Sequence, residues 1–204
     1  MSVYDEFKGI PTGNICDVNG LYGAMEHDIK PLSTNFSFSG EAYTVDCPAR
    51  DNLTIHKAIA EARPGSVLVV NCHQFVDAGI FGEMLATSCI AKGLKGIVID
   101  GACRDKAELI HLGFPVFSRA VCPNGTNKAD FGAVQNPIIC GGLPVKPGDV
   151  IIGDADGVVV IAKSKAETIL RLAKAKMASE LKLKSELAKG KTTADLFNYT
   201  RLWN

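Results

Sequence analysis

The stretch AGIFGEMLATSCIAKGLKGIVIDGACRD, residues 78–105, decides the fold. It predicts a glycine-containing turn, a short helix that ends at Gly93, a buried strand over residues 96–100 and a second turn. The strand is expected because residues 97–99 form a β-branched run, bounded by glycines, that is too short for a helix. Helix starts and strand ends meet at one edge of a layered sheet, so both turns are expected at that edge.

Charged side chains stand in both turns. Glu83 lies in the first turn, and Arg104 and Asp105 lie in the second. Arg104 offers a planar fork of donors that can bind a carboxylate or a developing enolate oxygen. Asp105 is a hard oxygen ligand of the kind that holds a hydrated Mg²⁺ ion. We therefore expect these residues to form a site for a small anion and a metal ion.

The first turn adds backbone donors to this candidate site. N–H groups at the start of a helix carry partial positive charge and can bind a carboxylate or a phosphate. A glycine at the start of the turn would let the ligand approach closely. The residues of this turn are Gly82, Glu83, Met84 and Leu85.

Spacing alone leaves purely structural interpretations open. Arg104 and Asp105 could form a surface ion pair, and Asp105 could cap the helix that follows it. Glu83 could be an ordinary acid in the first turn of a helix. The sequence pattern by itself selects no substrate.

Composition limits the class of protein. The chain has 204 residues, is 47% hydrophobic and carries 22 basic and 22 acidic side chains, which predicts one main domain with a substantial core. Formal neutrality gives no excess positive charge for direct nucleic-acid binding. No stretch approaches 18 apolar residues, and the N-terminus lacks a basic segment followed by an apolar one. We expect no membrane insertion and a cytoplasmic location.

Seven cysteines are scattered singly through the chain, with no pair at zinc-ligand spacing. Their apolar neighbours and odd number predict reduced, mostly buried thiols. Cys103 is the one candidate nucleophile, because the adjacent Arg104 could lower its thiol pKa. No histidine lies at a spacing that would supply its base.

The flanking segments predict a layered α/β sheet. Residues 11–24 predict a helix with Ile15, Val18 and Leu21 on one stripe, and residues 36–47 predict a strand interrupted at Gly40. A helix capped by Asp51 or Asn52 should end before Pro64. The uniformly apolar run VLVVN predicts a strand covered on both faces. In the first of these helices, the stripe of Ile15, Val18 and Leu21 is expected to face the sheet.

The second half continues this pattern. A helix is expected over residues 105–112, followed by a strand and by a turn-rich loop over residues 122–137, which is functional or mobile. Residues 150–152 and 158–161 should pair as a hairpin. Asp154 and Asp156 between them indicate turn chemistry in preference to metal binding.

The chain changes character at Ser164. A capping box from Ser164 to Glu167 should begin a helix that continues without a breaker to Gly190. Its apolar stripe is too long to be buried on residues 1–163 alone, so we expect the segment 164–204 to pack partly on a neighbouring subunit. The aromatic residues of the tail also suit docking on a partner: Phe197, Tyr199 and Trp203.

Several segments together resemble the RraA-like family, which includes class II 4-hydroxy-4-methyl-2-oxoglutarate/4-carboxy-4-hydroxy-2-oxoadipate aldolases. The main one, GEMLATSCIAKGLKGIVIDGACRDKAELIHLGFPVFSR, holds an acid, Glu83, then twenty residues, then Arg104-Asp105. The segments TGNICDVNG, GEAYTVDCPARDNLTIHKAIAEARPGSVLVV and GGLPVKPGDVIIGDADGVVVIAK agree in order and spacing. The resemblance covers nearly residues 10–163.

The resemblance implies a swivelling β/β/α sandwich, assembled as a homotrimer or hexamer with active sites between subunits. It implies Asp105 as the ligand of Mg²⁺ or Mn²⁺, Arg104 as the residue that binds the keto-acid oxygens, and the amides of residues 82–85 as the carboxylate site. Glu83 stands where many members have Asp, and its extra methylene could shift the position of the catalytic water.

The same resemblance implies more distant site residues. In aldolase members the C-terminal helix sends an acid to the adjacent site, for which Glu180 and Glu186 compete. Lys128, in the turn-rich loop, could reach the distal substrate carboxylate or could be a solvated surface lysine.

The implied activity is a metal-dependent carbon–carbon lyase. It would cleave a 4-hydroxy-2-oxo acid to pyruvate through an enolate, and it would decarboxylate oxaloacetate to the same enolate. The alternative implied by the family is a non-catalytic regulator that binds ribonuclease E or a helicase. No glycine-rich dinucleotide-type loop supports a methyltransferase.

Overall fold

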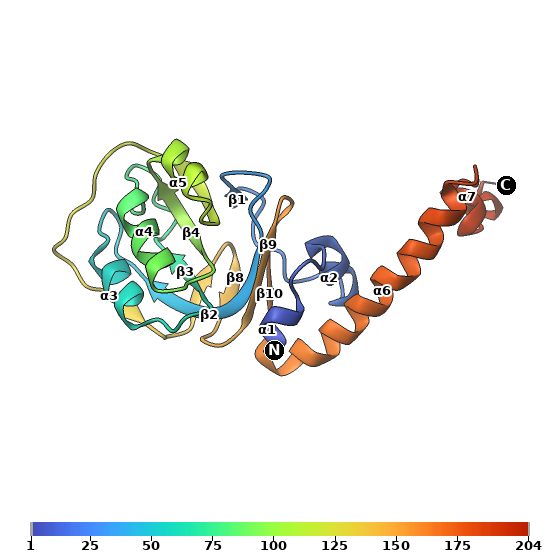
Figure 1. Ribbon diagram of the computed structural model, residues 1–204, viewed down its shortest axis with the longest axis horizontal. Coiled ribbons are helices and arrows are strands. Elements are labelled where there is room, and N and C mark those ends of the chain that lie inside the picture. Colours follow the sequence, from blue (N-terminus) through green and yellow to red (C-terminus); the bar gives the residue numbers. More distant parts are fainter. Residues whose placement is uncertain (1, 204) are drawn as a thin grey trace.

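A mixed sheet with the strand order β1-β5-β4-β3-β2-β9-β10 organises the molecule (Figure 1). The computed structural model describes residues 2–203. Neighbours among β2, β3, β4 and β5 are parallel, and β9 and β10 form an antiparallel hairpin at one side. The strands of this sheet are β1 (Lys30–Pro31), β2 (Phe38–Asp46), β3 (Ser66–Asn71), β4 (Gly96–Cys103), β5 (Val116–Val121), β6 (Ala133–Val134), β9 (Val150–Asp154) and β10 (Gly157–Ile161).

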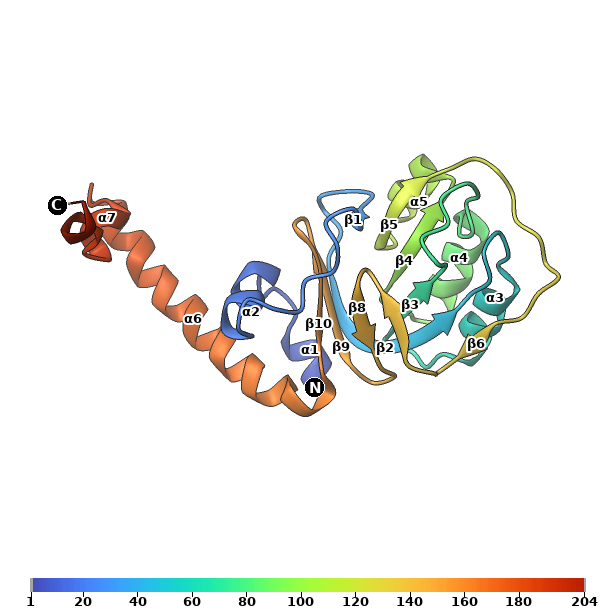
Figure 2. The same cartoon turned by 180° about the vertical axis from the view of Figure 1, so that it is seen from behind.

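Helices and a small second sheet cover the two faces of these strands. The second sheet consists of β7 (Ile138–Cys140) and β8 (Leu143–Val145). Figure 1 shows α3, α4 and α5 together on one face, and Figure 2 shows β8 in front of the other. The helical elements are α1 (Val3–Glu6), α2 (Thr12–Val18), α3 (Leu53–Glu61), α4 (Glu83–Ala91), α5 (Lys106–Leu112), η1 (Lys163–Lys165), α6 (Ala166–Leu187), α7 (Thr193–Leu196) and η2 (Tyr199–Leu202). This layering confirms the expected β/β/α sandwich.

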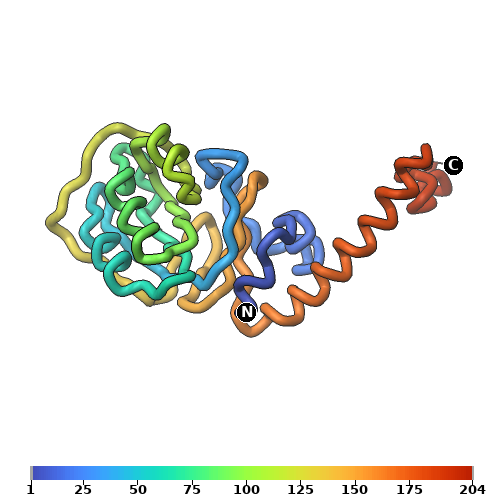
Figure 3. Tube along the Cα trace, in the orientation of Figure 1, coloured from blue at the N-terminus to red at the C-terminus, as the bar shows by residue number. Residues whose placement is uncertain are grey.

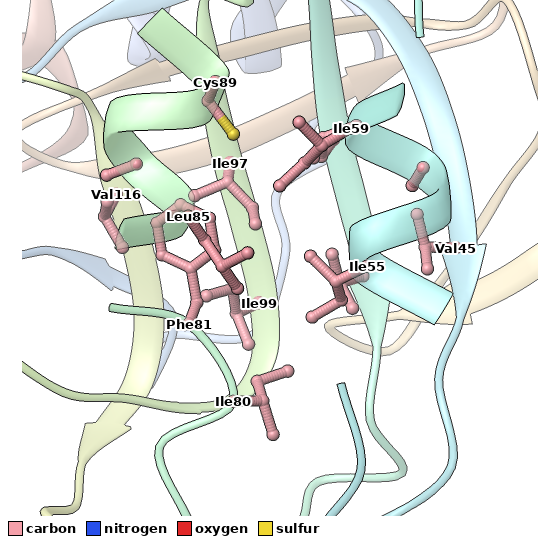
Figure 4. Close-up of a cluster of buried hydrophobic side chains, with 14 of the residues drawn as sticks. Val45, Ile55, Ile59, Ile80, Phe81, Leu85, Cys89, Ile97, Ile99 and Val116 are labelled. Carbon is pink, nitrogen blue, oxygen red and sulfur yellow. The ribbon is translucent and has the colours of Figure 1, made fainter. Parts of the chain in front are cut away.

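Burial on both faces explains why the central strands are uniformly apolar. Ile97 and Ile99 of β4 point toward α3 and α4, where they pack with Ile55 and Leu85 (Figure 4). Val98, between them, belongs to a second cluster with β7 and β8. Successive side chains of a strand face opposite sides, so each face of β4 is buried in a different layer.

Helices α1, α2 and α6 pack on the hairpin β9–β10 and form a third buried cluster with it. The strand pairing, with Val159 opposite Ile152, confirms the predicted hairpin. Asp154 ends β9 and accepts hydrogen bonds from Asp156 N at 3.0 Å and from Thr12 Oγ1 at 2.8 Å. These bonds agree with turn chemistry for Asp154.

Three local expectations are wrong. Leu21 is 82% exposed, because α2 ends at Val18 and the backbone then turns with φ of 61° at Leu21. Gly40 does not interrupt β2; an added Cβ there would lie 2.8 Å from the carbonyl oxygen of Gly65, so glycine serves close packing inside a continuous strand. Ser164 does not cap α6, since it lies in the short 3₁₀ turn η1.

Helix α6 projects away from the sandwich, as Figures 1 and 2 both show. Only its first part is buried on the domain: Ala166, Ile169, Leu170 and Ala173. Farther along, Leu181 is 68% exposed. Packing of this helix on a neighbouring subunit stays a prediction. No helix within residues 2–203 has the length and apolar character needed to cross a membrane.

Candidate functional site

A cavity of about 320 Å³ lies where the first turns of α3 and α4 meet the turn that follows β4. A loop between β5 and β6 passes outside this end of the molecule (Figure 3) and contributes to the cavity wall. The lining residues are Asn52, His56, Gly79, Ile80, Gly82, Met84, Leu85, Arg104, Asp105, Gly125, Thr126 and Lys128.

Backbone hydrogen bonds hold the two predicted turns together. Ile80 N donates to the carbonyl oxygen of Ala102 at 3.0 Å, and Arg104 N donates to that of Phe81 at 2.8 Å. Gly79 forms a further parallel bridge with Ala102. The segment before α4 therefore runs beside the end of β4, and the expectation that both turns share one edge is confirmed.

Asp105 is oriented toward α4 and away from its own helix. Its φ of 56° lies in the left-handed region, and although it is the N-cap residue of α5, its side chain caps no N–H of that helix. Its Oδ2 instead accepts a hydrogen bond from Glu83 N at 3.1 Å and lies 3.6 Å from Arg104 Nε. The helix-cap interpretation is wrong, and the Arg104–Asp105 ion pair exists as part of the cavity wall.

Gly82 makes this contact possible. A Cβ added at position 82 would overlap the Asp105 carboxylate and lie 3.1 Å from Cγ of Arg104. Any larger residue would push one of these side chains out of place. The glycine is therefore required by the close approach of two polar side chains to the start of α4.

The first turn of α4 leaves backbone donors at the cavity. Glu83 N is used by Asp105, and Ala86 N bonds to the carbonyl oxygen of Gly82 at 3.1 Å. Met84 and Leu85 lie between Glu83 and Ala86 in the sequence. Their N–H groups have no intrahelical acceptor, because the first N–H groups of a helix lack one. Both residues line the cavity, so their N–H groups suit an anionic ligand there.

Asn52 lines the same cavity and links the start of α3 to the segment before α4. Its side chain is buried, and its Nδ2 donates to the carbonyl oxygen of Ile80 at 3.1 Å. Its Oδ1 is buried without a hydrogen-bond partner among residues 2–203. The Ile80 carbonyl fixes the amide orientation, because a flipped amide would set two acceptors against each other. The sequence indicates Asn52 only as a helix cap and does not reveal its contact with Ile80.

His56 is a second residue that the sequence did not reveal. It lies one helical turn after Asn52 on α3 and lines the cavity. Burial lowers the pKa of His56, and the charge of Lys128 lowers it further. The imidazole is therefore neutral near pH 7 and can both donate and accept hydrogen bonds. Lys128 itself is exposed at the cavity rim.

Asp51 fastens the loop to the start of α3. Its Oδ1 accepts a hydrogen bond from Leu53 N at 2.7 Å, and its Oδ2 accepts from Ala129 N at 2.8 Å and from Asp130 N at 3.1 Å. Burial alone would raise the Asp51 pKa, but these N–H bonds outweigh it and lower the pKa. The predicted loop is thus an ordered wall over the cavity.

The structure does not bring every predicted acid to the cavity. The Glu83 side chain is exposed and does not line the cavity, which that residue reaches only through its backbone. Glu180 and Glu186 lie on α6, which projects from the opposite end of the molecule (Figure 1). Glu180 accepts from Asn14 Nδ2 at 2.9 Å, and Glu186 pairs with Lys189 at 2.6 Å. Either acid could serve only a site on another subunit.

The thiol of Cys103 is unsuited to nucleophilic chemistry. It is fully buried, lies 3.3 Å from Ser118 Oγ, and burial raises its pKa. The adjacent Arg104 does not turn it into a thiolate. Five of the seven cysteines are buried, and Cys16 and Cys122 are partly buried, which confirms the expectation of mostly buried thiols.

The oxygen ligands at the cavity suit a divalent ion that keeps most of its water ligands, and not an ion that is coordinated mainly by protein side chains. Within residues 2–203 no cluster of three or more His, Cys, Asp or Glu side chains is placed to hold a metal. Asp105 presents one carboxylate whose Oδ2 is oriented by Glu83 N and whose Oδ1 accepts no hydrogen bond from the described residues. Mg²⁺ keeps several waters and commonly binds one or two carboxylates plus substrate oxygens. The residues present therefore fit Mg²⁺ or Mn²⁺ at Asp105.

Comparisons with known proteins agree with this fold. A family model described as RraA-like, Aldolase/RraA, matches residues 12–160. A protein of Halalkalibacterium halodurans, named "Putative 4-hydroxy-4-methyl-2-oxoglutarate aldolase", is 39% identical over 175 residues, covering 86% of this chain and 83% of that protein.

Solved structures give the same picture. An uncharacterized protein from Pseudomonas syringae matches with a TM-score of 0.84 at 27% identity, over 93% of this chain and 94% of the other. RraAS2 of Streptomyces coelicolor, described as an unusual member of the RNase ES inhibitor RraA protein family, matches with a TM-score of 0.79 at 26% identity, over 91% and 97%.

Proposed function

Because this chain belongs to the RraA-like family, we propose that it is a divalent-metal-dependent class II pyruvate aldolase. Its substrate is a 4-hydroxy-2-oxo acid of the 4-hydroxy-4-methyl-2-oxoglutarate type, in line with the name of the Halalkalibacterium relative. The observation that carries the proposal is that Arg104, Asp105 and the first turn of α4 line one cavity. A guanidinium, a carboxylate and free backbone N–H groups there surround a space for one small keto acid.

Each group has a role in binding the pyruvyl part of the substrate. The N–H groups of Met84 and Leu85 bind its carboxylate, and Arg104 binds the 2-keto oxygen. Asp105 holds Mg²⁺ or Mn²⁺, which supplies Lewis-acid stabilisation of negative charge on oxygen. Asn52 has a supporting role: its Nδ2 donates to the carbonyl oxygen of Ile80 and so holds the segment before α4 against the start of α3.

Cleavage then needs one proton acceptor and one electron sink. The 4-hydroxyl proton passes to a water molecule, the bond between C3 and C4 breaks, and its electron pair remains on pyruvate as the enolate. C4 becomes the carbonyl carbon of the second product, and the enolate takes a proton at C3. Arg104 stabilises the enolate oxygen. The Glu83 side chain lies outside this cavity, so within one chain Glu83 contributes through its backbone N–H, which holds Asp105.

Oxaloacetate decarboxylation follows from the same geometry, because loss of CO₂ leaves the same enolate. The test of the proposed function is a coupled pyruvate assay over a panel of 4-hydroxy-2-oxo acids and oxaloacetate, with and without Mg²⁺. Metal-dependent pyruvate release is expected. No release from any panel member would refute the aldolase.

Assembly belongs to the same proposal. We propose a homotrimer or hexamer in which α6 packs on a neighbouring subunit and directs Glu180 or Glu186 toward that subunit's cavity. The exposed second half of α6 supports this arrangement.

A non-catalytic regulator is the second candidate, favoured by the similarity to RraAS2. Such a protein would inhibit ribonuclease E or a helicase without a metal. A ribonuclease E cleavage assay in Mg²⁺, with the parent chain or its Asp105→Asn variant added, separates the two functions. Inhibition by both proteins, without pyruvate release by the parent chain, would favour the regulator.

A further inference from the structure

A groove of about 310 Å³ between α3 and α4 continues the catalytic cavity. The two spaces share His56, Met84 and Leu85 as lining residues, so they adjoin. From Leu85 to Lys92 the groove follows seven residues, about 10 Å at the 1.5 Å rise of a helix. A ligand held at Arg104 could therefore extend well beyond the cavity along α4.

The middle of this groove is apolar. Ile59 and Leu85 form its floor and belong to the core between the helices and the sheet (Figure 4). Ala60 contributes a small side chain from α3, and Met84, which is 81% exposed, forms an adaptable edge. Such walls favour methylene groups over a hydrated polar chain.

The far end of the groove is positively charged. Lys92 follows the last turn of α4, and its Nζ donates to the carbonyl oxygen of Ala60 at 3.0 Å. Among residues 2–203 no acidic side chain pairs with this ammonium, which keeps further donor capacity. Ser88 adds a hydroxyl one turn earlier on the same wall. An apolar slot that ends at an ammonium is complementary to an aliphatic chain ending in an anion.

We propose that this groove is a second subsite, which binds an aliphatic chain ending in a carboxylate and carried on the distal side of the 2-oxo acid. The inference rests on the proposed function, because the oxo-acid end must lie at Arg104. It extends the proposed substrate class to 4-hydroxy-2-oxo acids whose distal side carries a longer aliphatic chain ending in a carboxylate. His56, at the junction, contacts the chain where it leaves the cavity.

The test measures binding, so it does not require turnover. The full-length protein with Mg²⁺ is titrated calorimetrically with 2-oxoglutarate, 2-oxoadipate, 2-oxopimelate and 2-oxosuberate, with 2-oxobutyrate as the short reference. Affinity should rise about threefold to fourfold for each methylene buried, the equivalent of about 0.8 kcal/mol. The monocarboxylate 2-oxooctanoate should bind more weakly than 2-oxosuberate, since it lacks the terminal anion.

Two variants locate the effect in the groove. Lys92→Gln should weaken 2-oxosuberate about tenfold and leave 2-oxobutyrate unchanged. Ser88→Trp, at an exposed position of the groove wall, should remove the dependence on chain length. Lys57→Gln is the matched control, because Lys57 is exposed on α3 and lines neither space. Its affinities should equal those of the parent protein.

The outcomes separate this inference from the proposed function. If short oxo acids bind but affinity does not change with length, the subsite is refuted and the aldolase stands. If binding depends on length but no 4-hydroxy-2-oxo acid releases pyruvate, the aldolase fails and the subsite stands. If no oxo acid binds, both fail. If Ser88→Trp alters sedimentation but not the length dependence, the groove is a subunit contact and the subsite is refuted.

Discussion

The carboxylate of Asp105 accepts a hydrogen bond from the backbone N–H of Glu83 across a sequence separation of 22 residues, at 3.1 Å. This bond joins the turn after β4 to the first turn of α4. It orients Oδ2 and leaves Oδ1 without a donor among the described residues. The first turn of α4 thus has two proposed roles. Its Glu83 N–H holds the metal ligand Asp105, and the N–H groups of Met84 and Leu85 bind the substrate carboxylate. The following predictions depend on this junction.

Replacing Arg104 by Ala should reduce kcat for pyruvate release by about a hundredfold to a thousandfold. A donor aimed at charge that forms in the transition state typically contributes that much. Arg63→Ala is the matched control, because Arg63 is exposed and lies outside the cavity lining. A coupled pyruvate assay measures both, and an Arg104→Ala rate equal to that of the control would disprove the assigned role.

Asp105→Asn should weaken Mn²⁺ binding at least tenfold while the fold is kept. The amide oxygen can still accept the hydrogen bond from Glu83 N, but the negative charge that attracts the ion is lost. Electron paramagnetic resonance of free Mn²⁺ measures this without reference to catalysis. EDTA should abolish the activity of the parent protein, and added Mg²⁺ should restore it. Undiminished Mn²⁺ binding by the variant would place the metal elsewhere.

Gly82→Ala should abolish activity and leave the protein folded. The new Cβ would overlap the Asp105 carboxylate, which must then swing away from Glu83 N. Gly13→Ala is the control, because a Cβ at position 13 meets no atom within 4 Å and Ala favours the helix α2. Thermal unfolding and pyruvate release are measured for both. Full activity in Gly82→Ala would show that the contact is dispensable.

The sequence predicts this junction well because each of its parts is local. The β-branched run, the glycine stops and the charged turns specify β4, α4 and α5, and parallel pairing then brings their ends together. The limits also have physical causes. The strand extends beyond residue 100 to Cys103, because a register shift between Ile99 and Ala102 lets pairing with β5 continue.

Residues that depend on long-range contacts could not be predicted in this way. Asn52 looks like an ordinary helix cap until the Ile80 carbonyl takes its amide and leaves Oδ1 unpaired. His56 has no motif partner, and only the position of α3 beside α4 brings it to the cavity. Leu21 fits a helical stripe by spacing, but spacing does not reveal that α2 ends at Val18.

Asp51 should make stability depend on pH in the acidic range. Its pKa is lowered in the folded protein, so its contribution is fully present above the unfolded pKa and is lost as pH falls through the folded value. Asp51→Asn should lower the free energy of unfolding by about 2 kcal/mol at pH 7, because buried N–H groups lose a charged acceptor. It should also flatten the loss of stability below pH 4.

Urea denaturation at several pH values measures the effect of Asp51→Asn. Asp17→Asn is the control, since Asp17 is an exposed acid that pairs with Lys176 and lies away from the loop. If Asp17→Asn lowers the free energy of unfolding as much as Asp51→Asn does, with the same pH dependence, the assigned role of Asp51 is wrong. Faster proteolysis of the loop in Asp51→Asn, but not in Asp17→Asn, is the accompanying local effect.

Helix α6 should hold the oligomer together through its exposed stripe. Ile169, Ala173 and Met177 pack on the chain's own domain at four-residue intervals, and Leu181 continues the same stripe where the domain ends. Sedimentation velocity should show a trimer or hexamer for the parent chain. Leu181→Glu should shift it toward monomer, because a charge would be buried in the contact.

Ser179→Glu tests whether the effect is specific to that face. Ser179 is exposed two residues away, on the opposite side of the helix, and its hydroxyl bonds only within α6, to the carbonyl oxygen of Lys176 at 2.7 Å. The added charge is the same, so a general effect of charge on the helix would change both variants equally. We expect Ser179→Glu to sediment like the parent chain. A parent chain that sediments as a monomer would contradict the assembly, and with it any contribution of Glu180 or Glu186 to a neighbouring cavity.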